Sequence, residues 1–448
     1  MNSVRLDHAA AAPPGDVLVR SARALDPRAG VDGPADLLIR EGQVAELGAP
    51  GSLAAPDGAE VVEGEGLVAV PAFVDPHVHL RTPGREDEED IDSGTRAAAA
   101  GGFCAILAMP NTAPVVDTAP VLQSLRERAR AEARIPTGFM AAITRGQRGE
   151  ELTEMAELAD AGAVGFTDDG APVVRAGVLR QAVQYQRLAD RVLALHEEDP
   201  SLSGAGAMHE GEVSALLGLA GIPSISESTM IARDAAIARY EGGRIHVQHV
   251  SAAESVEAVE RAKADGVRIS AEVTPHHLCL SDDSVRSLDA NSKMNPPLRS
   301  EEDRRALVEA LRSGTLDCVA TDHAPHAREE KEQPFEVAPM GVTGLETAFA
   351  ALHTRLVLPG LIDLSTLVMR MTAGGAPFGL PAPTLAPGAE ANVCLVDPEA
   401  EWEVGEAGYE SRSANCAFGG QPLTGRVRMT VAGGHVAYRE RSFAIGAV

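Results

Sequence analysis

Two histidines separated by one residue, His77 and His79, stand in the segment DPHVHLR at the end of an apolar run. Alternate side chains of an extended strand point to the same face, so both imidazoles and the guanidinium of Arg81 would share one face. Two imidazoles side by side on an inward face pack poorly against apolar groups, but they form a good metal chelate. The alternative interpretation is a pair of solvated histidines at a strand end.

Further imidazoles and carboxylates follow other short apolar segments. GFTDDG contains Asp168 and Asp169, RVLALH ends in His196, RIHVQHV contains His249, and LDCVATD ends in Asp322. If these segments are parallel strands of one barrel, their carboxyl ends meet on the face where barrel active sites lie. We therefore expect these side chains to converge with His77 and His79 on one metal centre.

The types of ligand limit the choice of metal and suggest its chemistry. Imidazoles and carboxylates without thiolates suit Zn²⁺, Mn²⁺, Co²⁺ or Fe²⁺, with zinc the default. Asp168 or Asp169 is placed to bridge two ions, so we expect one or two Zn²⁺ ions, with two favoured. Bound zinc lowers the pKa of water from 15.7 to about 7, which supplies hydroxide at neutral pH. Asp322 is then the natural general base and returns the proton to a leaving nitrogen.

Polar residues that follow the same strands are candidates for binding a substrate. Arg81 could place two parallel hydrogen bonds on a carboxylate. Asn111 in MPNT, Asn295 in KMNPPLR and His326 in DHAPH could orient amide and carboxylate groups. The alternatives are a surface ion pair for the arginine, turn-forming asparagines and a solvated loop for the histidine. The charged segment 327–337 is either a mobile lid over the mouth or a solvated surface loop.

Three further histidines lie near these motifs. His246 precedes His249 by three residues, so it should face the opposite side of its strand, and we expect no metal role for it. His276 and His277 follow a later strand in TPHH. They could support the metal ligands from behind, but local hydrogen bonding is the favoured interpretation.

The elements that must position these residues are predicted by alternating strand and helix patterns. Strand-like segments occur at 73–80, 103–109, 137–143, 163–167, 191–196, 244–250, 267–273 and 316–322. Helical segments occur between them, for example at 118–133, 254–265 and 301–313, and Gly266 follows the second as a stop signal. The span from Phe73 to Asp322 matches the roughly 250 residues of a (β/α)8 barrel. A doubly wound parallel sheet is the structural alternative.

Both flanks of this region alternate in short strand-like runs broken by glycine and proline. They predict a small β-sandwich domain assembled from residues 15–70 and 383–448, around a metal-binding (β/α)8 TIM-type barrel at 71–382. Residues 1–14 are predicted to be a disordered leader.

Composition excludes several classes of function. The chain has 448 residues and a formal net charge of −26, which disfavours binding to nucleic acid or to an anionic membrane. No apolar stretch reaches the roughly 18 residues of a membrane span. The five cysteines are far apart, and the first residues lack an apolar signal segment, so we expect a reduced, cytoplasmic protein.

Five motifs occur in a fixed order: DPHVHLRTPG, AMPNT, GFTDDG, KMNPPLR and ATDHAPH. In this order they resemble the class I (bacterial-type) dihydroorotases of the amidohydrolase superfamily, from about residue 16 to the C-terminus. The resemblance implies that Asp169 is the ligand shared by both ions. It implies that the metal ligands are His77, His79, Asp169, His196, His249 and Asp322. It implies that the substrate-binding positions are His79, Arg81, Asn111, Asn295, His326 and the backbone near Met340 and Gly341.

The reaction implied by the resemblance is the zinc-dependent, reversible cyclisation of N-carbamoyl-L-aspartate to L-dihydroorotate in pyrimidine biosynthesis. The expected partners are this small anionic substrate, a second copy in a homodimer, and an assembly with aspartate transcarbamoylase. The alternatives are a dihydropyrimidinase, hydantoinase or allantoinase, or a non-catalytic structural partner of the transcarbamoylase. Relatives of the hydantoinase type bridge their metals with a carboxylated lysine, and the segment FTDDG offers none. Glu197 and Glu198 depart from the expected pattern, because a less acidic pair is expected after His196.

Overall fold

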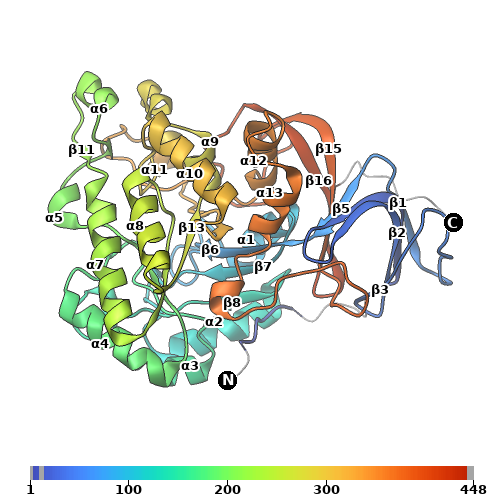
Figure 1. The fold of residues 1–448 in the computed structure, drawn as a ribbon, viewed down its shortest axis with the longest axis horizontal. Helices are drawn as coiled ribbons and strands as arrows, with labels where there is room; N and C mark the ends of the chain where they lie inside the picture. The colour runs from blue at the N-terminus through green and yellow to red at the C-terminus, as the bar shows by residue number, and fades with distance from the viewer. Residues whose placement is uncertain (1–3, 10–14, 441–448) are drawn as a thin grey trace.

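A closed ring of parallel strands forms the centre of the molecule in the computed structural model, which describes residues 4–9 and 15–440 (Figure 1). Neighbouring strands of the ring pair in parallel, β6 with β7 and β8, and β9 with β12, β13 and β14. A bridge from Val78 to His323 joins the last strand to the first. The ring strands are β6 (Phe73–Val78), β7 (Phe103–Ala108), β8 (Thr137–Phe139), β9 (Leu193–Leu195), β12 (Arg244–Val247), β13 (Arg268–Val273) and β14 (Cys318–Val319).

The predicted strand at 163–167 is present only in part. Phe166 makes single parallel bridges to Ala141 on one side and Leu193 on the other, and these bridges fill the gap between β8 and β9. Gly165 packs directly on Met140, whose side chain would lie 2.7 Å from an added Cβ. Backbone hydrogen bonds extend this pairing, because Val164 donates to Phe139, Ala141 to Gly165 and Thr167 to Ala141, at 2.9–3.0 Å. The segment therefore closes the ring between β8 and β9 at the predicted place, although only Phe166 forms full bridges.

Helices surround the ring, and their ends follow local sequence signals. Ser300 and Asp303 form a capping box that begins α10, and Gly314 ends it in a left-handed conformation. The helices predicted at 118–133, 254–265 and 301–313 are confirmed to within one residue at each end. The surrounding helices are α1 (Ile91–Ala100), α2 (Ala119–Glu132), α3 (Met155–Ala161), α4 (Ala176–Ala189), α7 (Ile225–Glu241), α8 (Ala253–Ala264), α10 (Glu301–Ser313), α12 (Ala348–Leu352) and α13 (Leu364–Met371).

Shorter elements lie in the connections, and several of them follow the carboxyl ends of the barrel strands. They are η1 (Arg145–Gln147), α5 (Pro200–Ser203), β10 (Met208–His209), α6 (Glu212–Leu217), β11 (Gly221–Ile222), α9 (Pro275–Cys279), η2 (Asp282–Ser287), η3 (Ala290–Ser292), α11 (Arg328–Lys331), η4 (His353–Val357) and η5 (Ala376–Phe378). The segment predicted as a lid or surface loop, 327–337, thus contains the one-turn helix α11.

Strands from both ends of the chain form the second domain, as Figure 1 shows at the right. They join in the order β17-β16-β15-β5-β1-β2-β3, with β4 beside β1. Apolar residues from both ends of this path, such as Val44 and Met429, share one core, so the sheet curls around it as a small β-sandwich. The strands are β1 (Val17–Asp26), β2 (Val31–Arg40), β3 (Gln43–Gly48), β4 (Glu60–Glu63), β5 (Val68–Pro71), β15 (Val393–Glu403), β16 (Pro422–Ala432) and β17 (His435–Arg439). The domain boundaries at 70/71 and 382/383 remain a proposal.

The predicted leader requires a correction where the structure describes it. Asp7 pairs with Thr137 at the edge of β8 through two backbone hydrogen bonds of 2.9 Å. Its carboxylate accepts hydrogen bonds from Arg126 and Arg130, and Leu6 packs against the barrel core. Residues 4–9 are therefore an ordered part of the fold, because a buried aspartate is paired with two arginines there. The rest of the predicted leader, 1–3 and 10–14, lies outside the described residues.

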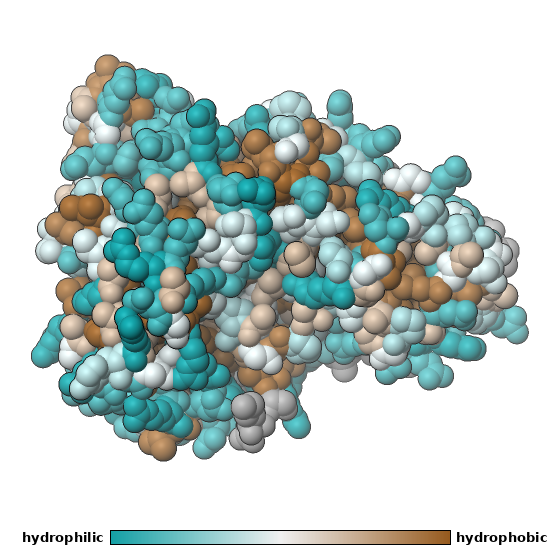
Figure 2. Space-filling view, in the orientation of Figure 1, coloured by the Kyte–Doolittle hydropathy of each residue, from teal (hydrophilic) through white to brown (hydrophobic). Residues whose placement is uncertain are grey.

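The surface is mostly hydrophilic on the face shown in Figure 2, with hydrophobic residues scattered among polar ones. This distribution agrees with the strongly acidic composition. Within the described part of the chain, every helix is too short or too polar to cross a bilayer. The five cysteines are all free, and four of them are buried, among them Cys104 and Cys318 in strands β7 and β14.

Candidate metal centre and active site

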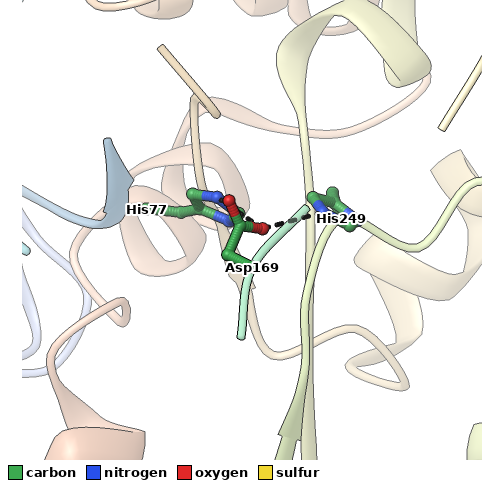
Figure 3. Close-up of side chains that lie close together, drawn as sticks. All are labelled: His77, Asp169 and His249. Atoms are coloured by element: carbon green, nitrogen blue, oxygen red, sulfur yellow. Dashed lines mark ion pairs between the residues drawn. The ribbon is translucent and has the colours of Figure 1, made fainter. Parts of the chain in front are cut away.

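Histidines and aspartates from five chain-distant segments converge at the carboxyl end of the barrel. Asp169 lies between the rings of His77 and His249 (Figure 3), with one carboxylate oxygen 3.4 Å from His77 Nε2 and 3.6 Å from His249 Nε2. The same oxygen lies 3.6 Å from His196 Nδ1. Its second oxygen lies 3.5 Å from His79 Nε2. One carboxylate thus contacts all four candidate imidazoles.

The cluster divides into two halves around this shared carboxylate. In the first half, Asp322 Oδ1 lies 3.1 Å from His79 Nε2 and 3.4 Å from His77 Nε2. In the second half, His196 Nδ1 lies 2.9 Å from His249 Nε2. Two sets of three residues each have ligand atoms within 4.8 Å of one another, His77 with Asp169 and His249, and His77 with His79 and Asp322.

These separations fit a metal better than they fit hydrogen bonds. Ligand atoms 2.0–2.1 Å from a tetrahedral zinc ion lie about 3.3–3.4 Å apart, close to the 3.4 Å that separates His77 Nε2 from Asp169 and from Asp322. His77 Nε2 is fully buried and has no hydrogen-bond partner among the described residues. A buried ring nitrogen without a partner is costly unless something else binds it. The donor set therefore fits a divalent metal ion.

The electrostatics of the cluster favour positive charge at the same point. Burial opposes charge on His77, but Asp169 and Asp322 outweigh it and raise the pKa of His77 well above its usual value. Burial would raise the pKa of Asp322, but the imidazoles of His77 and His79 lower it instead. The pKa of His196 rises to about 9 against the effect of burial, because Asp169 and Glu198 accept its hydrogen bonds. A site that stabilises protonated imidazole and ionised carboxylate together is one that attracts a cation.

Strained backbone marks three of the candidate site residues. Arg81, His249 and Asp322 have φ values of 53°, 32° and 46°, in the left-handed region that residues other than glycine rarely adopt. All three follow the ends of barrel strands, where the chain turns away from the ring. Such strain persists where the surrounding structure imposes it, and it concentrates at functional sites.

The two adjacent aspartates of GFTDDG have different environments. Asp168 accepts hydrogen bonds from the backbone N–H groups of Ile143 and Thr144, at 2.8 and 3.0 Å, and from the Thr144 hydroxyl. Burial raises the pKa of Asp168 to about 6. Asp168 therefore holds the chain beyond β8, and Asp169 is the member of the pair that reaches the cluster. The ambiguity left open by the sequence resolves toward Asp169 in this geometry.

Two carboxylates that sequence analysis did not assign contact the cluster from behind. Glu272 Oε1 lies 2.8 Å from His77 Nδ1, and Glu198 Oε2 lies 3.3 Å from His196 Nε2. The pKa of each falls to about 2 despite burial, because the neighbouring imidazoles donate to it. Glu272 had a signal in the sequence, since a lone glutamate inside the apolar strand 267–273 must be paired if it is buried.

The other histidines near the site have separate partners. His246 contacts Ser270 Oγ and Glu272 Oε2, each at 2.8 Å, so it lies behind the ligands as its position in β12 predicts. His277 makes the expected local hydrogen bonds, to the Thr274 hydroxyl and the Pro296 carbonyl. His276 differs, because its buried Nε2 has no partner among the described residues. Burial lowers the pKa of His276 to about 4, so it faces the site as a neutral ring.

The predicted substrate-binding residues surround the cluster. Asn111 Oδ1 lies 2.9 Å from His79 Nδ1, and its amide nitrogen donates to Asp169 at 3.3 Å. Asn295 donates to Glu198 at 2.6 Å. The same amide nitrogen of Asn295 lies 3.4 Å from His196 Nε2, so both amides contact residues of the metal cluster directly.

Arg81 and His326 contact each other. Arg81 donates to the Pro325 carbonyl at 3.0 Å, and its guanidinium lies 3.5 Å from His326 Nε2. The same ring nitrogen lies 2.9 Å from the Met340 carbonyl. Asn415, which sequence analysis missed, donates to the Gly341 carbonyl and accepts from the His326 backbone. It lies in the connection between β15 and β16, far from every motif in the sequence.

This arrangement combines the parts needed to hydrolyse or form an amide bond. The cluster can hold a Lewis acid, and Asp322 is a carboxylate at its edge that can exchange a proton. An arginine and two amides lie around it and can orient a substrate that carries carboxylate and amide groups.

Comparisons with known proteins agree with this chemistry. A family model described as "Dihydro-orotase-like" matches residues 66–255. A dihydroorotase from Pelotomaculum thermopropionicum is 44% identical over 95% of this chain and 99% of its own length. One from Anaeromyxobacter dehalogenans is 46% identical over 95% of this chain and 98% of its own.

Solved structures share the fold. An L-hydantoinase (dihydropyrimidinase) from Arthrobacter aurescens superposes with a TM-score of 0.85 at 26% identity, covering 96% of this chain and 97% of that one. A dihydropyrimidinase from Brevibacillus agri gives a TM-score of 0.82 at 22% identity, covering 96% of each chain, and shows likeness of fold alone. The predicted barrel with its β-sandwich domain is therefore confirmed.

Proposed function

The chain belongs to the dihydroorotase family, and we propose that its metal-ligand cluster carries out the reversible cyclisation of N-carbamoyl-L-aspartate to L-dihydroorotate. The observation that carries this proposal is the convergence of four imidazoles on the single carboxylate of Asp169, with Asp322 in contact with two of them, His77 and His79. The family and the ligand cluster together imply a metal cofactor. That the cofactor is zinc, with two ions bridged by Asp169, is part of the proposal.

When bound, the metal would activate water and polarise the carbonyl group of the substrate. Asp322 would move the proton. In ring opening its carboxylate takes a proton from water and gives it to the leaving ring nitrogen. In cyclisation the carbamoyl nitrogen attacks the side-chain carboxyl carbon, the C–N bond forms, a C–O bond breaks and water leaves. Cyclisation consumes one proton, because a carboxylate disappears.

The substrate carries a further carboxylate and a ureido group, and the surrounding residues match them. Arg81 would hold the carboxylate that does not react. Asn111 and Asn295 would exchange their present contacts with His79 and Glu198 for contacts with substrate. His326 and the backbone at Met340 and Gly341 would complete the binding side of the mouth, next to Arg81.

The main alternative function is hydrolysis of another cyclic amide, such as hydantoin or allantoin. The bridging position here is occupied by Asp169, and lysine occurs only at positions 263, 293 and 331. Each of these lysines donates to backbone carbonyls elsewhere, so none reaches the cluster. A chain that uses aspartate as the bridge supports dihydroorotate as substrate over hydantoin or allantoin. A non-catalytic role is disfavoured, since every predicted ligand position is filled.

Turnover by the purified, zinc-loaded chain tests the proposal. We expect it to release dihydroorotate from N-carbamoyl-L-aspartate, and to do so faster than it opens hydantoin or allantoin. Asp322→Ala should retain metal in the second half of the cluster but lose at least 100-fold in kcat, the lower range for a general base. Asp317→Asn is the control, because Asp317 precedes β14 and pairs with Lys263 instead. Wild-type turnover by Asp322→Ala would remove Asp322 from the mechanism.

A homodimer and an assembly with aspartate transcarbamoylase are further proposals that rest on the family. The mass of the chain in solution, alone and mixed with the transcarbamoylase of the same organism, tests both.

A further inference from the structure

Two imidazoles of the cluster, His77 and His196, have one ring nitrogen toward the shared carboxylate of Asp169 and the other against a glutamate oxygen. His77 directs Nε2 toward Asp169 and contacts Glu272 through Nδ1 at 2.8 Å. His196 does the reverse, with Nδ1 toward Asp169 and Nε2 3.3 Å from Glu198. The two rings therefore face the site through opposite nitrogens.

Hydrogen-bond chemistry assigns the proton in each ring. An ionised carboxylate only accepts hydrogen bonds, so the ring nitrogen that contacts it carries the hydrogen. A neutral imidazole has one N–H group, so the other nitrogen keeps its lone pair. With Glu272 behind Nδ1, His77 offers the lone pair of Nε2. With Glu198 behind Nε2, His196 offers that of Nδ1.

We propose that Glu272 and Glu198 are positioning residues that fix opposite tautomers of His77 and His196, one in each half of the cluster. The inference rests on the proposed metal centre and adds to it two residues outside the predicted ligand and substrate sets. Groups that orient metal-binding histidines in this way raise metal affinity about 10- to 100-fold.

Glu272 is itself held in place by buried groups. Its Oε2 accepts from His246 Nε2 at 2.8 Å, and His246 Nδ1 contacts Ser270 Oγ at 2.8 Å. Its Oε1 also accepts the backbone N–H of His249 at 3.3 Å, so one carboxylate touches a ligand from each half. This network gives His246 a role in positioning Glu272.

A second residue, Gln248, also contacts His77 Nδ1. The amide nitrogen of Gln248 lies 3.3 Å from His77 Nδ1. An amide nitrogen can only donate, so it cannot accept a proton from this ring nitrogen. The contact to Glu272 is shorter by 0.5 Å (3.3 against 2.8 Å) and has the acceptor that the ring needs. Gln248 Nε2 also donates to Met109 Sδ, so it has another partner.

Glu198 connects the metal ligand to the substrate side of the site. Its Oε2 accepts from Asn295 Nδ2 at 2.6 Å as well as from His196. The side chain is 20% exposed, unlike Glu272, which is 1% exposed. Loss of Glu198 should therefore affect substrate binding as well as metal binding, whereas loss of Glu272 should affect metal binding chiefly.

Nitrogen-15 NMR of the zinc-loaded, histidine-labelled wild-type chain tests the inference directly. Two-bond proton–nitrogen correlations distinguish a protonated ring nitrogen from a metal-bound one. We expect His77 to be protonated at Nδ1 and His196 at Nε2, with signals assigned from His77→Ala and His196→Ala. Protonation of the same nitrogen in both rings, or the reverse pattern, would overturn the proposal. This measurement needs no glutamate variant to fold.

Isosteric variants supply the second measurement. Glu272→Gln and Glu198→Gln should each weaken zinc binding about 10- to 100-fold in a chelator competition. Glu198→Gln should also raise KM. Glu346→Gln is the matched control, because Glu346 is a largely buried carboxylate that accepts two backbone N–H groups away from the cluster. Wild-type zinc affinity in both Glu272→Gln and Glu198→Gln would contradict the proposal.

Failure of this inference is distinct from failure of the proposed function. A chain that binds zinc and turns over dihydroorotate, but through the opposite ring nitrogens, overturns only the roles of Glu272 and Glu198. A chain with the expected nitrogens and no turnover overturns the substrate and leaves these roles supported. A chain that binds no zinc overturns both.

Discussion

Arg81 is held at the mouth of the barrel by contacts that leave few alternatives for its side chain. It adopts a left-handed backbone conformation, donates to the Pro325 carbonyl and lies 3.2 Å from Glu88. A planar guanidinium fixed in this way can receive a carboxylate through two parallel hydrogen bonds. Lysine would keep the charge but lose that geometry.

Arg81→Lys should therefore weaken substrate binding and leave the metal in place. A hydrogen bond to a charged group contributes about 1.5–3 kcal/mol, so KM should rise about 10- to 100-fold. Steady-state kinetics with metal analysis of the same sample checks this. The control is Arg85→Lys, since Arg85 pairs with Glu88 and Glu330 at a more exposed position. An unchanged KM in Arg81→Lys would assign the carboxylate to another residue.

Some residues of the candidate site could be predicted from the sequence, and others could not. The convergence of the candidate ligand histidines and Asp322 was predictable, because each follows an apolar strand and barrel geometry brings strand ends together. The choice between Asp168 and Asp169 was open from the residues alone, since the two are adjacent and their backbone conformation decides which one turns inward. Asn415 carried no local signal at all, because its partner His326 is 89 residues away in the sequence.

At the scale of elements, the segment after β14 is attached more firmly than a charged loop suggests. Lys331 Nζ, in α11, donates to the carbonyls of Pro339 and Gly341 at 3.0 and 2.9 Å. Lys293 Nζ donates to three further carbonyls of the same segment. Two lysines thus fix the backbone that carries Met340 and Gly341 beside the site.

Lys331→Met should loosen this segment and raise KM several-fold, with zinc affinity unchanged. The reason is that Met340 and Gly341 lose the contacts that hold them near His326. Lys263→Met is a matched control, because Lys263 also donates to backbone carbonyls, but at the end of α8 and away from the site. Kinetics of the two variants at equal zinc content makes the comparison. Equal KM values would mean that the segment takes no part in binding.

The elements themselves were predictable to different degrees. Long helices such as α10 carry caps and a periodic apolar face, so their ends were predicted closely. The segment at 163–167 takes its predicted place between β8 and β9, but composition does not reveal that Phe166 alone forms bridges on both sides. The segment 4–9 is too short to show a periodic pattern, and its order depends on tertiary contacts of Asp7 with two distant arginines.

At the scale of the whole molecule, the C-terminal strands do more than complete the β-sandwich. The connection between β15 and β16 returns to the barrel, where Thr343 bridges to Cys416 and Asn415 binds the Ala324 and Gly341 carbonyls. Both ends of the chain are therefore needed to build the β-sandwich domain. The C-terminal part also supports the mouth of the barrel. This division could be inferred from β-rich flanks, but the contact with the site could not.

Glu346 stands at this junction and should make stability depend on pH. Its carboxylate accepts the backbone N–H groups of Glu410 and Ser411, at 3.0 and 3.1 Å. Burial raises the pKa of Glu346 from 4.5 to about 7. Between those values the folded chain holds a proton that the unfolded chain releases, so folding is favoured below pH 4.5 and this contribution is lost as pH rises through 7.

Replacing Glu346 by glutamine removes the titrating group and keeps its shape. Relative to wild type, Glu346→Gln should gain up to about 3 kcal/mol in free energy of unfolding between pH 4.5 and pH 8, because each pKa unit corresponds to about 1.4 kcal/mol. Urea unfolding at both pH values measures the difference. Glu127→Gln, an exposed change on α2, should show a difference that stays flat with pH. A flat difference for Glu346→Gln as well would mean that the carboxylate at the junction stays ionised in the folded chain.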